Sequence, residues 1–152
     1  MKTSNFLNST GLFIGLLAAT AFLGVSWVRA YSADNAPAIE GVDWGQHPKA
    51  TLLLVPPGDC GCGMKPIEMA REAAGHHIDF IAVSAGSNEH LQEVRAASIK
   101  GSRIVVNTHV PLELIRRYCK AKSSTALQIE NGRVRFQVEG NLPSDFFDRF
   151  KS

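Results

Sequence analysis

The feature that most restricts the fold of this chain is a short, unbroken apolar run at residues 51–55 (TLLLV), which ends at Pro56, Pro57 and Gly58. An apolar run without alternation is typical of a central strand that is covered on both faces. Two similar runs follow at residues 78–83 and 104–106. Strands of this kind need helices on both sides of their sheet, so the sequence predicts an α/β fold.

The segments between these runs carry apolar residues at helical spacing. Residues 64–74 are expected to form a helix that Gly75 ends. Residues 88–99 are expected to form a second helix that Gly101 ends, and Pro111 is well suited to the first turn of a third. Strands and helices therefore alternate through the first two thirds of the domain.

The C-terminal third has a different pattern. Residues 125–129 and 134–138 flank Asn131-Gly132, which is the strongest short-range signal for a β-hairpin. Ser144 can cap a final helix, whose apolar stripe would be Phe146, Phe147 and Phe150. An antiparallel hairpin added to alternating strands and helices predicts a mixed sheet with helices on both faces.

The N-terminal segment is directed to a membrane. Residues 12–28 carry no charge, and at about 1.5 Å per residue they reach slightly less than a hydrocarbon core of about 30 Å. We expect residues 1–30 to hold an uncleaved anchor with a single transmembrane helix. The alternatives are a signal peptide cut after Ala30 and a buried core helix. Either membrane reading places the domain on the periplasmic or extracellular side.

The rest of the chain divides into a linker, residues 31–49, and one domain, residues 50–152. The chain has 152 residues, of which 45% are hydrophobic and 20% charged, enough to bury one ordinary core. Its formal net charge is +2, and this near balance gives no reason to expect a nucleic-acid partner.

Cys60 and Cys62 stand one residue apart between the first predicted strand and the first predicted helix. Unpaired amides at a helix N-terminus favour a thiolate over a thiol. Gly61 permits the bend that a disulfide between such close residues needs, and the short ring would be strained and easily reduced. The pattern predicts an exchanging disulfide. A metal-binding pair and an inert Gly-rich turn are the alternatives.

From residue 50 to residue 151, the order of parts resembles the thioredoxin superfamily. Residues 59–66 (DCGCGMKP) look like its active-site turn with the helix proline, and residues 126–134 look like its C-terminal hairpin. The helix and strand between residues 88 and 106 look like the insertion of redoxins, including TlpA-like membrane-tethered thioredoxins. The resemblance implies a thioredoxin-like three-layer sandwich with a mixed sheet, here preceded by one N-terminal transmembrane helix.

The resemblance also implies roles for individual residues. Cys60 would attack a substrate disulfide, and Cys62 would resolve the mixed disulfide. The position of the family's cis-proline falls on Ser124, followed by Thr125, so these residues are the candidates for substrate binding. A cis bond before a residue other than proline costs about 2.5–4 kcal/mol, so we expect a trans bond here. No cofactor and no resident metal is expected.

The sequence departs from the family's pattern at the motif itself. Gly63 stands where the second cysteine usually lies, and Asp59 replaces the usual tryptophan. An ionised Asp59 would oppose the helix N-terminus and raise the pKa of Cys60. Peroxidase chemistry is not expected, because Pro57 stands where peroxiredoxins carry threonine.

Cys119 is the third cysteine. It shares an apolar helix face with Leu112 and Ile115, which is typical of a buried, inert thiol. The alternative is a third redox thiol or a third ligand, since a C-x-C pair with one more soft ligand could hold Cu(I), zinc or an iron–sulfur cluster. His76-His77 is expected to be a solvated helix end.

The sequence thus predicts an extracytoplasmic thiol–disulfide oxidoreductase, anchored in the membrane through residues 12–28. Its partner would be a protein dithiol or disulfide, and its reactive pair Cys60 and Cys62. Two alternatives remain open: a metal-binding thioredoxin-like module, and a degenerate redoxin fold used for protein contacts.

Overall fold

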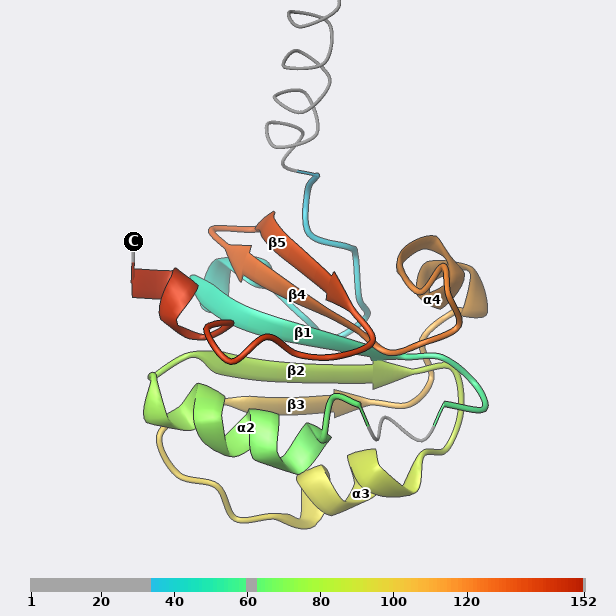
Figure 1. Ribbon diagram of the computed structural model, residues 1–152, viewed down its shortest axis with the longest axis horizontal. Coiled ribbons are helices and arrows are strands. Elements are labelled where there is room, and N and C mark those ends of the chain that lie inside the picture. Colours follow the sequence, from blue (N-terminus) through green and yellow to red (C-terminus); the bar gives the residue numbers. More distant parts are fainter. Residues whose placement is uncertain (1–33, 60–62, 152) are drawn as a thin grey trace, which may run out of the picture. The chain divides into compact units, whose positions relative to one another are not determined.

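The computed structural model describes residues 34–59 and 63–151. Within them, five strands form a sheet in the order β3-β2-β1-β4-β5 (Figure 1). Strands β1, β2 and β3 pair in parallel, whereas β4 pairs antiparallel with both β1 and β5. The strands are β1 (Lys49–Val55), β2 (Asp79–Ser84), β3 (Ile104–Asn107), β4 (Thr125–Glu130) and β5 (Arg133–Glu139).

Helices cover both faces of this sheet. The α-helices are α2 (Pro66–Gly75), α3 (Glu89–Ala96) and α4 (Leu112–Tyr118), and short 3-10 helices occur at η1 (Trp44–Gln46) and η2 (Asp148–Lys151). Helices α2 and α3 pack on one face and α4 on the other (Figure 1). The predicted α/β fold with a mixed sheet is therefore confirmed for the described residues.

The predicted transmembrane segment, residues 12–28, lies outside the described residues. Among the helices of the described part, none has the length and hydrophobicity to cross a membrane.

Burial along β1 explains why its sequence does not alternate. Every residue of β1 after Lys49 is buried. Leu53 and Val55 face the core cluster beneath α2 and α3, while Leu52 and Leu54 face the cluster beneath α4. Both sides of the strand therefore need apolar side chains.

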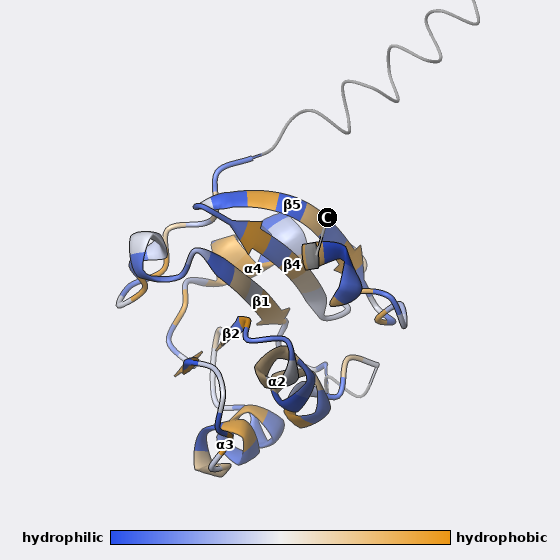
Figure 2. Ribbon diagram, turned by 90° about the vertical axis from the view of Figure 1, so that its left-hand side faces the viewer, coloured by the Kyte–Doolittle hydropathy of each residue, from blue (hydrophilic) through white to orange (hydrophobic). Residues whose placement is uncertain are grey.

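Strand β5 forms an edge of the sheet and shows the opposite pattern. Exposed and partly buried residues alternate along most of it. Figure 2 shows hydrophilic and hydrophobic colours alternating along the same strand. Asn131 and Gly132, which join it to β4, have φ values of 51° and 73°. Positive φ at both central residues is what a type I′ hairpin turn requires. The hairpin predicted from Asn131-Gly132 is confirmed.

Helix α2 begins later than predicted, at Pro66 instead of Met64. Proline suits the first position of a helix, but its ring disfavours α-helical geometry in the residue before it. Lys65 accordingly adopts a left-handed conformation, with φ 45° and ψ 73°. Met64 is buried in the core. Three residues therefore separate Cys62 from α2 along the chain, whereas the favourable field of a helix end fades within about one turn.

The last predicted helix is only the short 3-10 helix η2. The N–H of Phe146 donates to the Pro143 carbonyl at 3.1 Å, and the N–H of Phe150 donates to the Phe147 carbonyl at 3.3 Å. Both bonds span three residues, as in 3-10 geometry. The three phenylalanines are nevertheless buried in the cluster beneath α2. The prediction was right about the apolar stripe and wrong about the type of helix.

Part of the segment predicted as a linker packs against the sheet. The N–H of Ala36 donates to the Gly132 carbonyl at 2.9 Å, and the N–H of Val134 donates to the Asp34 carbonyl at 2.9 Å. Ile39 is 6% exposed and belongs to the core cluster beneath α4. These contacts begin at Asp34, so residues that were predicted as a linker pack with the domain before β1 begins.

The same segment ends in a partly buried polar contact. His47 is 6% exposed, and its Nδ1 lies 2.7 Å from Oδ2 of Asp79. The other carboxylate oxygen of Asp79 accepts a hydrogen bond from the Arg103 N–H at 3.0 Å. His47 thus links the segment before β1 to the first residue of β2 and to the loop that leads into β3.

We predict that Ile39→Ala lowers the free energy of unfolding by about 2 kcal/mol or more, because it removes a buried side chain from the core. Glu40→Ala is the matched control, since Glu40 is exposed and changes of this kind usually stay within about 0.5 kcal/mol. Chemical denaturation of both variants measures the difference. Equal effects would show that Ile39 adds nothing to the domain.

Candidate active site

Three loops meet at the end of the sheet where the parallel strands have their carboxyl ends (Figure 1). Strand β1 leaves the sheet through a tight turn, in which the N–H of Asp59 donates to the Pro56 carbonyl at 3.2 Å. Gly58 has a φ of 82°, which a turn with glycine at its third position requires. The turn directs Asp59 toward the start of β4. The predicted catalytic residues Cys60 and Cys62 come next and lie outside the described residues.

Asp59 is held by Ser124. The N–H of Ser124 donates to Oδ2 of Asp59 at 2.5 Å, and the Ser124 hydroxyl donates to the same oxygen at 2.7 Å. Hydrogen bonds to a charged acceptor typically contribute about 1.5–3 kcal/mol each. Ser124 is 2% exposed and Asp59 is of intermediate exposure, so the contact is partly shielded from water. The residue before Cys60 is therefore fixed to the residue before β4.

The third loop follows β5. The N–H of Gly140 donates to the Ser124 carbonyl at 2.9 Å. Both backbone hydrogen-bonding groups of Ser124 are thus used within the chain, one by Asp59 and the other by Gly140. We predicted Ser124 and Thr125 as substrate-binding residues, and that role stays a prediction.

Thr125 is fully buried as the first residue of β4. Its hydroxyl donates to the Tyr118 carbonyl at 3.3 Å, and its backbone pairs with Leu54 and Glu139 in the sheet. The trans bond expected before these residues is confirmed, because the described residues contain no cis peptide bond.

Gly63 follows the cysteines and packs against the backbone of the third loop. A Cβ atom added at Gly63 would lie 2.8 Å from the Gly140 carbonyl oxygen and 3.2 Å from Oδ1 of Asn141. The shorter distance is a clash with backbone. The position at which the family usually carries its second cysteine therefore has no room for a side chain in this fold.

Cys119 is a free thiol that is 5% exposed, and its Sγ lies 3.6 Å from the Leu54 carbonyl oxygen. Burial raises the pKa of the Cys119 thiol; a hydrogen bond from Thr125 lowers it, and the negative charges of Glu139 and Asp59 raise it further. A thiol whose pKa is raised in this way is a poor nucleophile at neutral pH. The predicted burial of Cys119 is confirmed, although Cys119 is the residue that follows α4 and not a member of the helix.

His76 and His77 follow the last residue of α2. His76 stacks on Phe147, with ring centroids 5.8 Å apart, at the end of α2 remote from the cysteines in the sequence. Within residues 34–59 and 63–151, no group of three or more His, Cys, Asp or Glu side chains is arranged to hold a metal ion.

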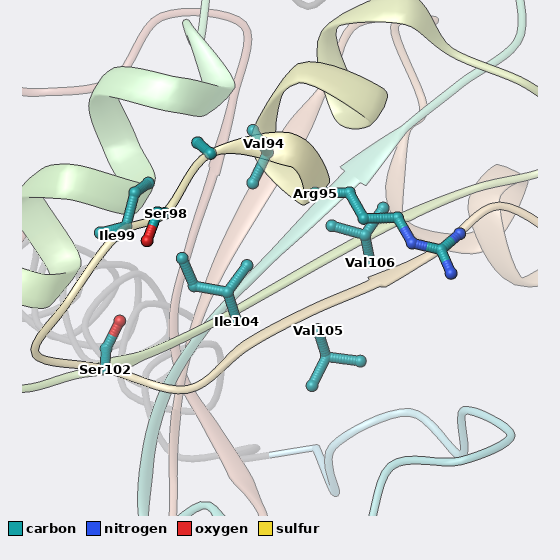
Figure 3. A pocket seen from close by; sticks show the side chains of 9 residues that line it. Val94, Arg95, Ser98, Ile99, Ser102, Ile104, Val105 and Val106 are labelled. Carbon is teal, nitrogen blue, oxygen red and sulfur yellow. The ribbon is translucent and has the colours of Figure 1, made fainter.

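A hollow lies between α3 and the edge strand β3 (Figure 3). Its residues come from these two elements and the loop between them, and none belongs to the three loops that meet at Asp59. Its apolar lining includes Val94, Ile99, Ile104 and Val106. We assign it no part in the chemistry of the cysteines.

The sequence analysis missed two features of this site. It did not pair Asp59 with Ser124, and it did not place Gly63 against Gly140. Both contacts join residues far apart in the chain, since Asp59 and Ser124 are 65 positions apart. The local signals were present, because Asp59 and Gly63 are the two residues at which the motif departs from the family's pattern.

The mixed sheet with helices on both faces agrees with the thioredoxin-like sandwich that the resemblance found in the sequence implied. No protein-family model matches the sequence, and no curated protein matches it. Among solved structures, 11 chains match. One is described as a thiol:disulfide interchange protein DsbE from Chlorobium tepidum, with 17% sequence identity and a TM-score of 0.47, covering 78% of this chain and 92% of that chain. At this identity and TM-score, the likeness assigns no activity to the present chain.

We predict that Gly63→Ala lowers the free energy of unfolding by about 1–3 kcal/mol, because the added Cβ must displace the backbone at Gly140. Gly86→Ala is the control, since a Cβ at Gly86 meets no atom within 4 Å. Denaturant titration of both variants gives the comparison. A Gly63 variant as stable as the Gly86 variant would contradict the clash.

The raised pKa of Cys119 also leads to a prediction of how stability depends on pH in the alkaline range. Its pKa in the folded protein lies above the ordinary value of 9.0, so the unfolded chain loses this proton first as pH rises. The free energy of unfolding should fall by up to about 1.4 kcal/mol per pH unit from about pH 9 to the folded-state pKa. Cys119→Ala should remove this part of the slope.

The measurement is the free energy of unfolding of both proteins from about pH 8 to about pH 10. Burial is the largest influence on the pKa of Tyr118 and raises it. Tyr118 is present in both proteins, so its contribution to the pH dependence cancels in the comparison. Parallel pH profiles for the two proteins would contradict the prediction.

Proposed function

We propose that the chain is a thiol–disulfide oxidoreductase that exchanges electrons with a protein disulfide through Cys60 and Cys62. The observation that carries this proposal is the structure on either side of the cysteines. Asp59 is fixed by Ser124 on one side, and Gly63 is packed against Gly140 on the other. The Cys-Gly-Cys stretch is therefore bounded by two anchored residues, where a central strand leaves the sheet.

The reduction of a partner would take two exchange steps. The Cys60 thiolate attacks one sulfur of the partner's disulfide, forming a mixed disulfide and releasing the partner's other sulfur as a thiolate that takes up a proton. The Cys62 thiolate then attacks the Cys60 sulfur and releases the second partner thiol. The partner gains two electrons and two protons, and the chain is left with a Cys60–Cys62 disulfide. A dithiol donor must reduce it for the next cycle, and the reverse sequence would oxidise a partner.

The buried third thiol takes no part in this scheme. Cys119 is 5% exposed, and its raised pKa disfavours a thiolate. A two-cysteine exchange therefore accounts for the chemistry without Cys119.

We also propose the location that the sequence suggests. Residues 12–28 would anchor the chain in a membrane as a single pass, with the domain on the periplasmic or extracellular side. Disulfide substrates are abundant on that side, because the environment there is oxidising.

We predict that Cys60→Ser reduces the turnover of a disulfide substrate to the uncatalysed level, because the attacking sulfur is lost. The Cys62→Ser variant should still attack the substrate disulfide through Cys60 but should fail to resolve the mixed disulfide, which should therefore accumulate. Reduction of insulin by dithiothreitol measures turnover in the full chain. Non-reducing electrophoresis after acid quenching detects the trapped complex.

Cys119→Ala is the matched control and should keep the turnover of the unaltered protein. Equal turnover in the Cys60→Ser variant and the unaltered protein would overturn the proposed function.

A further inference from the structure

The contact between Asp59 and Ser124 does more than hold a loop in place. Ser124 contributes only donors, and both reach the same Asp59 oxygen. The side-chain oxygen of asparagine could accept the same two hydrogen bonds, so the geometry alone does not require a charge at this position. What the carboxylate adds is a negative charge on the residue joined directly to Cys60.

We propose that Asp59 is a positioning residue that sets the reactivity of Cys60: its charge, held in place by Ser124, disfavours the Cys60 thiolate and biases the couple toward donating electrons. This inference rests on the proposed function and deepens it. A neighbouring like charge disfavours ionisation, and the effect is strongest where water is partly excluded. The two bonds from Ser124 keep the charge from turning away into solvent.

Asp59 and a second acid both act on the buried Cys119 thiol. From the end of α4, the Cys119 thiol feels the charges of both Asp59 and Glu139. From the end of β5, Glu139 accepts a hydrogen bond from the Ala121 N–H at 2.6 Å, which keeps this second carboxylate close to the loop that precedes Ser124. The titratable groups described around Asp59 thus include one further acid and one buried thiol.

The direction of the bias follows from thiol chemistry. A thiolate of low pKa stabilises the reduced form of a dithiol couple, which makes its disulfide a strong oxidant. Suppression of the Cys60 thiolate has the opposite effect. The reduced form is then less favoured, so the dithiol gives up two electrons to a partner disulfide more readily.

The test compares Asp59→Asn with Asp59→Glu in the full chain. Asp59→Asn removes the charge and keeps an acceptor for Ser124, whereas Asp59→Glu keeps the charge. With Cys62→Ser present in every sample, the rate of Cys60 alkylation by iodoacetamide is followed against pH by mass spectrometry. Asp59→Asn should move the midpoint to lower pH and raise the rate at neutral pH roughly three- to tenfold, since one pH unit corresponds to about a tenfold change in thiolate. Asp59→Glu should leave the midpoint near that of the Asp59 protein.

A second measurement uses both cysteines intact. Equilibration with glutathione should show the Asp59→Asn couple to be more oxidising, by about 30 mV for each tenfold change in the exchange constant. Asp145→Asn is the control, because it removes one exposed acid that pairs with Arg149 instead of Ser124. A purely structural role for Asp59 would lower stability without moving the alkylation midpoint.

The inference is overturned if Asp59→Asn leaves the alkylation midpoint unchanged or moves it to higher pH. The alkylation measurement needs no substrate protein, so its result can contradict the role of Asp59 without bearing on the proposed function. A shifted midpoint together with unimpaired insulin reduction by Cys60→Ser would support the role of Asp59 and reject the enzymatic function.

Discussion

The rest of the structure depends on the burial of β1 from both faces. Its alternate leucines enter two separate core clusters, each closed by helices on its own side of the sheet. Full burial of one such side chain contributes about 1.5–3 kcal/mol, so the strand is a major source of stability. The same strand leads directly into the turn at Pro56 and then to Asp59. The position of the candidate active site therefore follows from the strand that the core holds most firmly.

Much of the fold could be predicted because its signals are local. The apolar run at residues 51–55 indicated a central strand, and Asn131-Gly132 indicated a hairpin whose two φ values are both positive. The start of α2 was placed too early because the effect of Pro66 on the residue before it was not taken into account. The final helix was misjudged because a spacing such as Phe147 to Phe150 suits one turn of either an α-helix or a 3-10 helix.

The contacts of the candidate site could not be predicted in the same way, because they join distant parts of the chain. Counting back from the hairpin identified Ser124 as the residue at the family's proline position, and Ser124 does lie against the residue before Cys60. The sequence did not indicate that its N–H and hydroxyl would both bind Asp59. Two departures from the family's pattern, aspartate before the first cysteine and serine in the facing loop, thus form one interaction. Each was unexplained when considered alone.

The close approach of Gly63 to the Gly140 carbonyl has a consequence for how this motif can evolve. A single substitution that moved the second cysteine to position 63 would meet the backbone of a loop far away in the sequence. A chain of this kind would acquire the commoner spacing at a cost in stability unless the loop after β5 shifted as well. The unusual spacing of the two cysteines in the sequence is therefore coupled to the course of the main chain after β5.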